Sequence, residues 1–144
     1  MKTDDITIQP GTALVISGPQ GCGKSRLAQR IAKRMGPMVV VSFDTLLSDE
    51  ALPHVINGDT AVIEVIELPF GKITADPSVL ARVKQLITCD TWLYRPPFSA
   101  QSKRIPSPRL IFTTNETAEA SVLCKFSRRL ALLELGVDGQ PVTH

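Results

Sequence analysis

The residues from Gly18 to Ser25 have the types and spacing needed to bind a chain of phosphates. They read Gly-Pro-Gln-Gly-Cys-Gly-Lys-Ser. The glycines let the main chain curl so that several N–H groups point at an anion, and a helix starting near Gly23 adds its positive dipole end. Lys24 can reach the β- and γ-phosphates as a point charge, and the Ser25 hydroxyl can bind Mg²⁺. The segment therefore predicts a nucleotide site.

The flanking residues predict the strand and helix that such a loop requires. Residues 12–17 form a short apolar run rich in β-branched side chains, which is typical of a buried parallel strand. Leu27, Ile31 and Met35 then recur every four residues until Gly36-Pro37, which indicates a helix and its end. We assign nucleotide contacts to Gly18, Pro19, Gln20, Gly21, Cys22, Gly23, Lys24, Ser25 and Arg26.

Further apolar segments complete an alternating α/β pattern. They predict strands over 39–43, 61–66, 110–114 and 130–135, and helices over 48–57, from Pro77 after an Asp76 cap, and over 119–126. Alternating strands and helices favour a parallel sheet with helices on both faces, in which ligands bind at the carboxyl ends of the strands.

Two glutamates are candidates for the acid that a nucleotide hydrolase needs to hold Mg²⁺. Residues 62–68 read Val-Ile-Glu-Val-Ile-Glu-Leu, without the adjacent Asp-Glu pair expected at the end of the third strand. We favour Glu67 as the functional acid and metal ligand beside Ser25, because it is nearer the carboxyl end. Glu64 is the second choice, since a carboxylate inside an apolar strand must find a partner. A glutamate without a functional role is the alternative for each.

Polar residues beyond the later strands suggest further roles. Asn115 can both donate and accept, so it can link a water molecule to a phosphate; a helix cap is the alternative. Arg128 and Arg129 can offset transition-state charge, or can be a solvated helix end.

The segment 91–108 has no helical pattern and predicts a hairpin or a loop. Arg95, Lys103 and Arg104 lie among three aromatic residues there, a composition that suits the binding of a phosphate backbone and the stacking of bases. A solvated surface loop is the alternative interpretation.

Several of these segments resemble those of AAA+ ATPases and superfamily-3 helicases. Residues 110–115, Leu-Ile-Phe-Thr-Thr-Asn, resemble the sensor-1 strand, whose final Asn helps to position the lytic water. Residues 83–90 with the following stretch are similar to the superfamily-3 segment that leads into a DNA-contacting hairpin, and residues 126–130, Phe-Ser-Arg-Arg-Leu, to an arginine-finger segment. The resemblance extends from Leu14 to Leu135.

The resemblance implies a three-layer P-loop NTPase fold with a five-stranded, mainly parallel sheet in the AAA+-like order 5-1-4-3-2. It also implies ATP and Mg²⁺ as cofactors, single-stranded DNA as a partner, and a homo-oligomer such as a hexamer in which Arg129 or Arg128 acts on a neighbouring subunit. A minimal ATPase core from a phage or another mobile element is the description that fits best.

Composition sets the remaining bounds. A length of 144 residues with 43% hydrophobic content predicts one domain over 1–144, and no lid is evident after the fifth strand. Three scattered cysteines argue against disulfides and a zinc cluster, and a net charge of +2 leaves nucleic-acid binding to a local patch. No apolar run is long enough to cross a membrane, so we expect a cytoplasmic protein.

Two other functions remain open at this point. A small-molecule kinase shares the phosphate loop and often has an acid such as Asp44 after the second strand to hold the acceptor. A nucleotide-dependent binding module without efficient hydrolysis is the other alternative, since the acid pair is altered.

Overall fold

Five parallel strands form the central sheet of the protein. The computed structural model describes residues 6–66, 70–125 and 127–142. The sheet consists of β1 (Ala13–Ser17), β2 (Met38–Ser42), β3 (Val62–Ile66), β6 (Arg109–Thr114) and β7 (Leu130–Glu134), in the order β2-β3-β6-β1-β7. Numbered among these five alone, the order is 5-1-4-3-2, so the predicted fold and strand order are confirmed.

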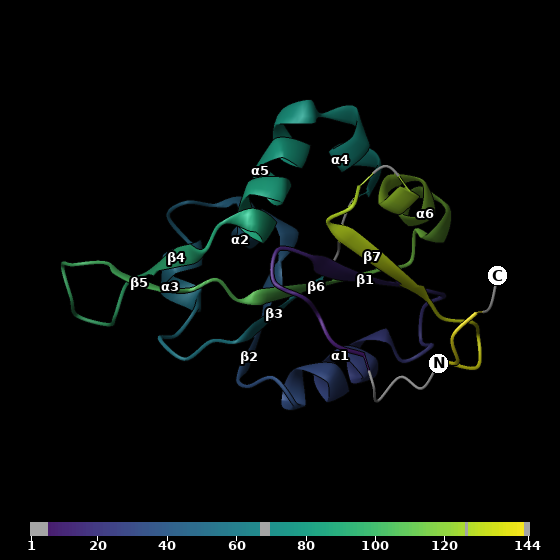
Figure 1. Ribbon diagram of the computed structural model, residues 1–144, viewed down its shortest axis with the longest axis horizontal. Coiled ribbons are helices and arrows are strands. Elements are labelled where there is room, and N and C mark those ends of the chain that lie inside the picture. Colours follow the sequence, from purple (N-terminus) through teal and green to yellow (C-terminus); the bar gives the residue numbers. More distant parts are fainter. Residues whose placement is uncertain (1–5, 67–69, 126, 143–144) are drawn as a thin grey trace.

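Side chains alternate between two cores because successive residues of a strand face opposite sides of the sheet. Leu14 and Ile16 pack with α1 (Lys24–Lys33) on one face. Ala13 and Val15 face the larger core, which includes side chains of α2 (Phe43–Leu47), α3 (Leu52–Val55), α4 (Phe70–Ala75), α5 (Pro77–Thr88) and α6 (Thr117–Lys125). Figure 1 shows α1 on one side of the sheet and α4, α5 and α6 on the other, which gives the three predicted layers.

The two best-marked helices form where the sequence places them. In α1 the buried residues are Leu27, Ala28, Ile31 and Ala32, which lie on one stripe, and the last turn carries two basic side chains next to the negative dipole end. Asp76 caps α5 through a 3.0 Å bond from the Ser78 amide, as predicted. Hydrogen bonds from the side chain and amide of Ser78 lower the pKa of Asp76.

Between β2 and α5 the prediction was only partly correct. The helix expected over 48–57 is limited to α3, which has Pro53 in its first turn, and α2 follows β2 directly. The Ser42 hydroxyl accepts a 3.2 Å bond from the Thr45 amide and so caps α2 at the strand end. The helix α4 was not predicted.

The segment between α5 and β6 is a hairpin rather than an irregular loop. Its strands β4 (Thr91–Tyr94) and β5 (Lys103–Pro106) pair antiparallel, with Trp92 opposite Ile105. Both of these side chains are buried, and the Trp92 indole donates a 3.2 Å bond to the Leu86 carbonyl. The hairpin joins β6 at its amino end and projects away from the sheet (Figure 1).

Candidate functional site

The phosphate loop joins the carboxyl end of β1 to the first turn of α1. Its Gly18 amide donates a 3.2 Å bond to the Thr114 carbonyl of β6, which fixes the start of the loop against the neighbouring strand. Gly23 is the N-cap of α1, with a φ of 95°, a left-handed conformation in which a side chain would be strained. The loop therefore opens directly onto the N-terminus of a ten-residue helix.

Lys24 is the meeting point of the loop and of β6. Its ammonium donates to the carbonyls of Gly18 and Pro19 at 3.0 and 2.9 Å, and to Asn115 Oδ1 at 2.6 Å. An ammonium has three donors, so these three oxygens satisfy it. The structure thus brings together two predicted catalytic residues that are 91 positions apart in the sequence.

Ser25 and Glu64 form a second polar contact at the same edge. The Ser25 hydroxyl donates to Glu64 Oε2 at 3.1 Å, and Glu64 is 1% exposed within β3. Its other oxygen, Oε1, is buried and has no hydrogen-bond partner among the described residues. Burial raises the pKa of Glu64 above its ordinary value of 4.5, and the bond from Ser25 opposes that rise.

These two side chains fit Mg²⁺. A hydroxyl and a carboxylate are the hard oxygen ligands that Mg²⁺ prefers, and the unpartnered Oε1 is an acceptor that a cation or its water would satisfy. Within the described part of the chain, no cluster of three or more His, Cys, Asp or Glu side chains forms a metal site of its own. Ser25 and Glu64 would therefore share the ion with phosphate and water, as is usual for Mg²⁺.

Glu67, which we favoured as the acid, lies outside the described residues, and so does Phe126. The preference for Glu67 stays a prediction. Glu64 lies on the face of the sheet that α1 covers, which explains why it reaches Ser25. That placement follows from strand alternation, because Val62, two residues earlier, packs on the same face.

One polar residue next to the site was missed. Glu116 follows Asn115, and its Oε2 accepts a 2.8 Å bond from the Phe70 amide at the start of α4. The sequence offered one signal for Glu116, namely an acidic residue directly after Asn115. Its partner, the Phe70 amide, is 46 residues away in the sequence and could not be predicted. Through Glu116, the turn that carries Asn115 is fixed to the segment that follows β3.

The arginines predicted to act on phosphate lie away from the loop of their own chain. Arg128 and Arg129 are exposed and precede β7, and the Arg129 side chain donates to the Gly11 carbonyl at 3.3 Å, before β1 begins. The five residues of β1 separate this point from the loop, a distance of roughly 16 Å at 3.3 Å per residue. Arg26 is exposed on the first turn of α1.

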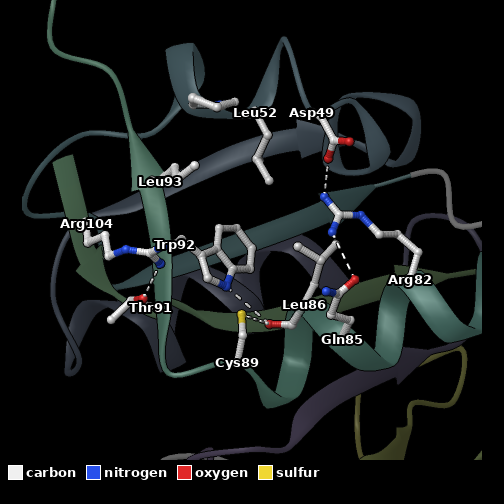
Figure 2. A pocket seen from close by; sticks show the side chains of 11 residues that line it. Asp49, Leu52, Arg82, Gln85, Leu86, Cys89, Thr91, Trp92, Leu93 and Arg104 are labelled. Atoms are coloured by element: carbon white, nitrogen blue, oxygen red, sulfur yellow. Dashed lines mark hydrogen bonds and ion pairs between the residues drawn. The ribbon is translucent and has the colours of Figure 1, made fainter. Parts of the chain in front are cut away.

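The hairpin presents Arg95, Lys103 and Arg104, all exposed, at the amino end of β6. A cavity of about 390 Å³ lies at the base of the hairpin. Trp92, Leu86 and Leu52 form an apolar wall of this cavity (Figure 2). The Arg104 guanidinium lies at this cavity and donates to the Thr91 hydroxyl at 3.0 Å. The predicted nucleic-acid residues therefore gather on one element, at the opposite end of β6 from Asn115.

The sequence matches a family model described as RNA helicase over residues 14–116, which include the phosphate loop, β3, the hairpin and Asn115. The chain belongs to the RNA helicase family. The match bears out the resemblance to P-loop helicases of superfamily 3. No curated protein matches the sequence significantly.

Solved structures with the same fold include two of the NrS-1 C-terminal region without ligand. One has a TM-score of 0.56 and 18% identity over 90% of this chain, and the other 0.55 and 19% over 88%. This RNA helicase family chain spans 30% of each of those chains. At such identities the likeness establishes the fold. Within the part of the chain that the structure describes, no helix is long and apolar enough to cross a membrane.

We expect Glu64→Gln to gain stability relative to the wild type as the pH rises. The pKa of Glu64 is higher in the folded domain than in the unfolded chain. Between these two pKa values the folded state binds the proton more tightly than the unfolded state, so the stability of the wild type falls as the pH rises. Glutamine has no proton to lose. Urea unfolding of both proteins from pH 4 to pH 8, without nucleotide, gives the difference in unfolding free energy.

The matched control is Glu119→Gln, because Glu119 is exposed on α6. Its difference from the wild type should not shift in favour of glutamine over the same range. If the wild type instead gained stability relative to Glu64→Gln as the pH rises, the result would contradict a buried carboxylate whose burial is not compensated.

Proposed function

We propose that this domain binds ATP with Mg²⁺, hydrolyses it, and acts on single-stranded nucleic acid as a homo-oligomer. The observation that carries the proposal is the meeting of Lys24, Ser25 with Glu64, and Asn115 at the carboxyl ends of three adjacent strands. Membership of the RNA helicase family supports a nucleotide-dependent action on nucleic acid.

Each residue at this edge has a role that its chemistry allows. Lys24 would exchange its carbonyl partners for phosphate oxygens, because an ammonium is attracted more strongly to an acceptor that itself carries negative charge. Ser25 and Glu64 would hold Mg²⁺, which would neutralise charge on the outer phosphates. Asn115 would orient water toward the γ-phosphate. Glu67 stays a candidate for the functional acid and metal ligand beside Ser25, as the sequence predicts.

An arginine from a neighbouring subunit completes the site in this proposal. Arg129 and Arg128 lie at the amino edge of the sheet, roughly 16 Å from the phosphate loop of their own chain. Another copy can present them to this loop when subunits pack head to tail, which is how rings form. Hydrolysis then depends on assembly.

The hairpin supplies the nucleic-acid contact in this proposal. Lys103 and Arg104 offer positive charge for a phosphate backbone, and β6 runs from the hairpin to Asn115 in six residues. Strand β6 is paired on both sides in the sheet, so it is a stiff connection. Binding at one end of β6 is therefore positioned to affect the water-orienting residue at the other.

We expect Asn115→Ala to lower kcat for ATP hydrolysis by about a hundredfold, the usual cost of removing one positioned polar group. Its Kd for Mg²⁺-ATP should stay within about threefold of the wild type, because one neutral contact is lost from the ground state. Phosphate release and equilibrium binding provide the two measurements, and Lys24→Ala should weaken binding itself by about tenfold or more.

Asn57→Ala is the matched control, since Asn57 is exposed in the loop before β3 at the other edge of the sheet. It should turn over ATP as the wild type does. Equal kcat values in Asn115→Ala and Asn57→Ala would refute the role of Asn115 in hydrolysis. Transfer of phosphate to a metabolite in place of water would refute hydrolysis itself.

We expect Arg129→Ala alone and Lys24→Ala alone to be nearly inactive, and their mixture to regain activity. In a mixed assembly, a Lys24→Ala subunit supplies its arginine to the intact phosphate loop of an Arg129→Ala subunit. Loss of an arginine finger costs about 10³-fold or more in kcat, so partial recovery is easily measured. Turnover per subunit of the wild type should also rise with protein concentration. A mixture that assembles but stays inactive would argue against Arg129 as the residue that acts on a neighbouring subunit.

We expect single-stranded DNA or RNA to stimulate ATP turnover, and Lys103→Ala to lose much of this stimulation while keeping basal turnover. Lys103 is exposed at the hairpin and far from the phosphate loop, so its removal leaves the nucleotide site intact. Lys84→Ala, on the exposed side of α5, is the control and should respond as the wild type does. Parallel assays with DNA and RNA identify the preferred nucleic acid. Stimulation that persists in Lys103→Ala would show that Lys103 does not contribute to the nucleic-acid contact.

A further inference from the structure

The chain after β7 folds back as a tight turn. The Gly136 amide donates to the Gln140 carbonyl at 2.9 Å, and the Gly139 amide to the Gly136 carbonyl at 2.9 Å. The returning segment is anchored to β7, because the Val142 amide donates to the Glu134 carbonyl at 2.8 Å. The turn over Gly136–Gln140 is therefore held in place by backbone bonds at both of its ends.

This turn packs directly against the phosphate loop. A Cβ atom at Gly139 would lie 2.6 Å from the Cys22 carbonyl oxygen, closer than Cβ atoms approach other heavy atoms in proteins. A Cβ atom at Gly18 would lie 2.8 Å from the Leu135 carbonyl oxygen. Figure 1 shows the turn, in yellow, beside the connection between β1 and α1. At both points backbone meets backbone, which only glycine permits.

The contact at Cys22 acts on the part of the loop that faces phosphate. The peptide group is planar and trans, so the Cys22 carbonyl and the Gly23 amide N–H point in opposite directions from one rigid unit. The turn lies on the carbonyl side, and the N–H points away from it at the N-terminus of α1, where phosphate would bind. Displacing the carbonyl therefore re-aims the N–H.

We propose that the turn Gly136–Gln140 braces the phosphate loop, and that Gly139 is a positioning residue for nucleotide binding. The inference rests on the proposed function, since it concerns the same nucleotide site. A side chain at position 139 pushes the Cys22 carbonyl out of place and turns the Gly23 amide away from the phosphate. Affinity for Mg²⁺-ATP then falls even when the domain stays folded.

The test compares Gly139→Ala with Gly11→Ala. Both glycines have left-handed backbones, with φ values of 76° and 78°, so alanine is similarly strained at each. At Gly11, however, the nearest atom to a new Cβ is the far end of the Arg129 side chain at 3.1 Å, which can move aside. We expect Gly139→Ala to raise the Kd for Mg²⁺-ATP about tenfold, the value of one charge-assisted hydrogen bond, and Gly11→Ala to leave it unchanged.

Gly139→Asn separates contact from backbone strain. Asparagine tolerates the left-handed conformation but still has a Cβ atom, so it should lose affinity as alanine does, and it serves the same comparison if Gly139→Ala does not fold. Melting temperatures of all variants are measured alongside the Kd. Wild-type affinity in Gly139→Asn, or equal loss in Gly139→Ala and Gly11→Ala, overturns the brace. A wild type that binds no Mg²⁺-ATP overturns the proposed function instead.

Discussion

The bond between the Lys24 ammonium and Asn115 depends on the register of two parallel strands. Ser17 of β1 lies opposite Thr114 of β6, so the two chains leave the sheet at the same level. This register lets Lys24, seven residues after the end of β1, reach Asn115, the first residue after β6. A shift of one residue in this pairing would also turn the buried side chains of β6 to the wrong face, so core packing fixes the geometry of the site.

The same alternation explains why a charged residue is tolerated inside β3. Ile63 and Val65 fill the larger core, whereas Glu64 faces α1, at the point where the helix starts and Ser25 is available. A carboxylate in place of Ile63 or Val65 would lose its hydration inside the larger apolar core. The single hydrogen bond from Ser25 leaves one oxygen unsatisfied, and that cost is what a bound cation would offset.

The sequence was sufficient for the parts that local chemistry determines. Apolar runs located all five strands of the sheet, and the spacing of Leu27 and Ile31 marked α1, because these patterns reflect burial on a strand or on one helix face. The loop from Gly18 to Ser25 could be found for the same reason: its glycines and lysine are needed by local backbone geometry.

Contacts between distant segments could not be read in this way. The helix α4 escaped prediction since no cap precedes it in sequence; its first amide is bonded to Glu116, far along the chain. The contact of Glu64 with Ser25 depends on Glu64 facing α1. The preference for Glu67 relied on distance along the strand and stays a prediction. Gly139 has no motif at all, because its constraint comes from the Cys22 carbonyl.

If the proposed function is correct, the position of the hairpin limits how bound nucleic acid can affect bound nucleotide. Hairpin and phosphate loop lie at opposite ends of β6, which has six residues and is therefore roughly 20 Å long at 3.3 Å per residue. What connects them is a strand bonded to β1 on one side and β3 on the other, the two strands that lead to Lys24 and carry Glu64. A movement of β6 relative to these neighbours would disturb the bond between Lys24 and Asn115, because that bond joins the segments that follow β1 and β6. In the proposed function, the link between the two ends of β6 is therefore mechanical, and Asn115 is the residue at which it would act.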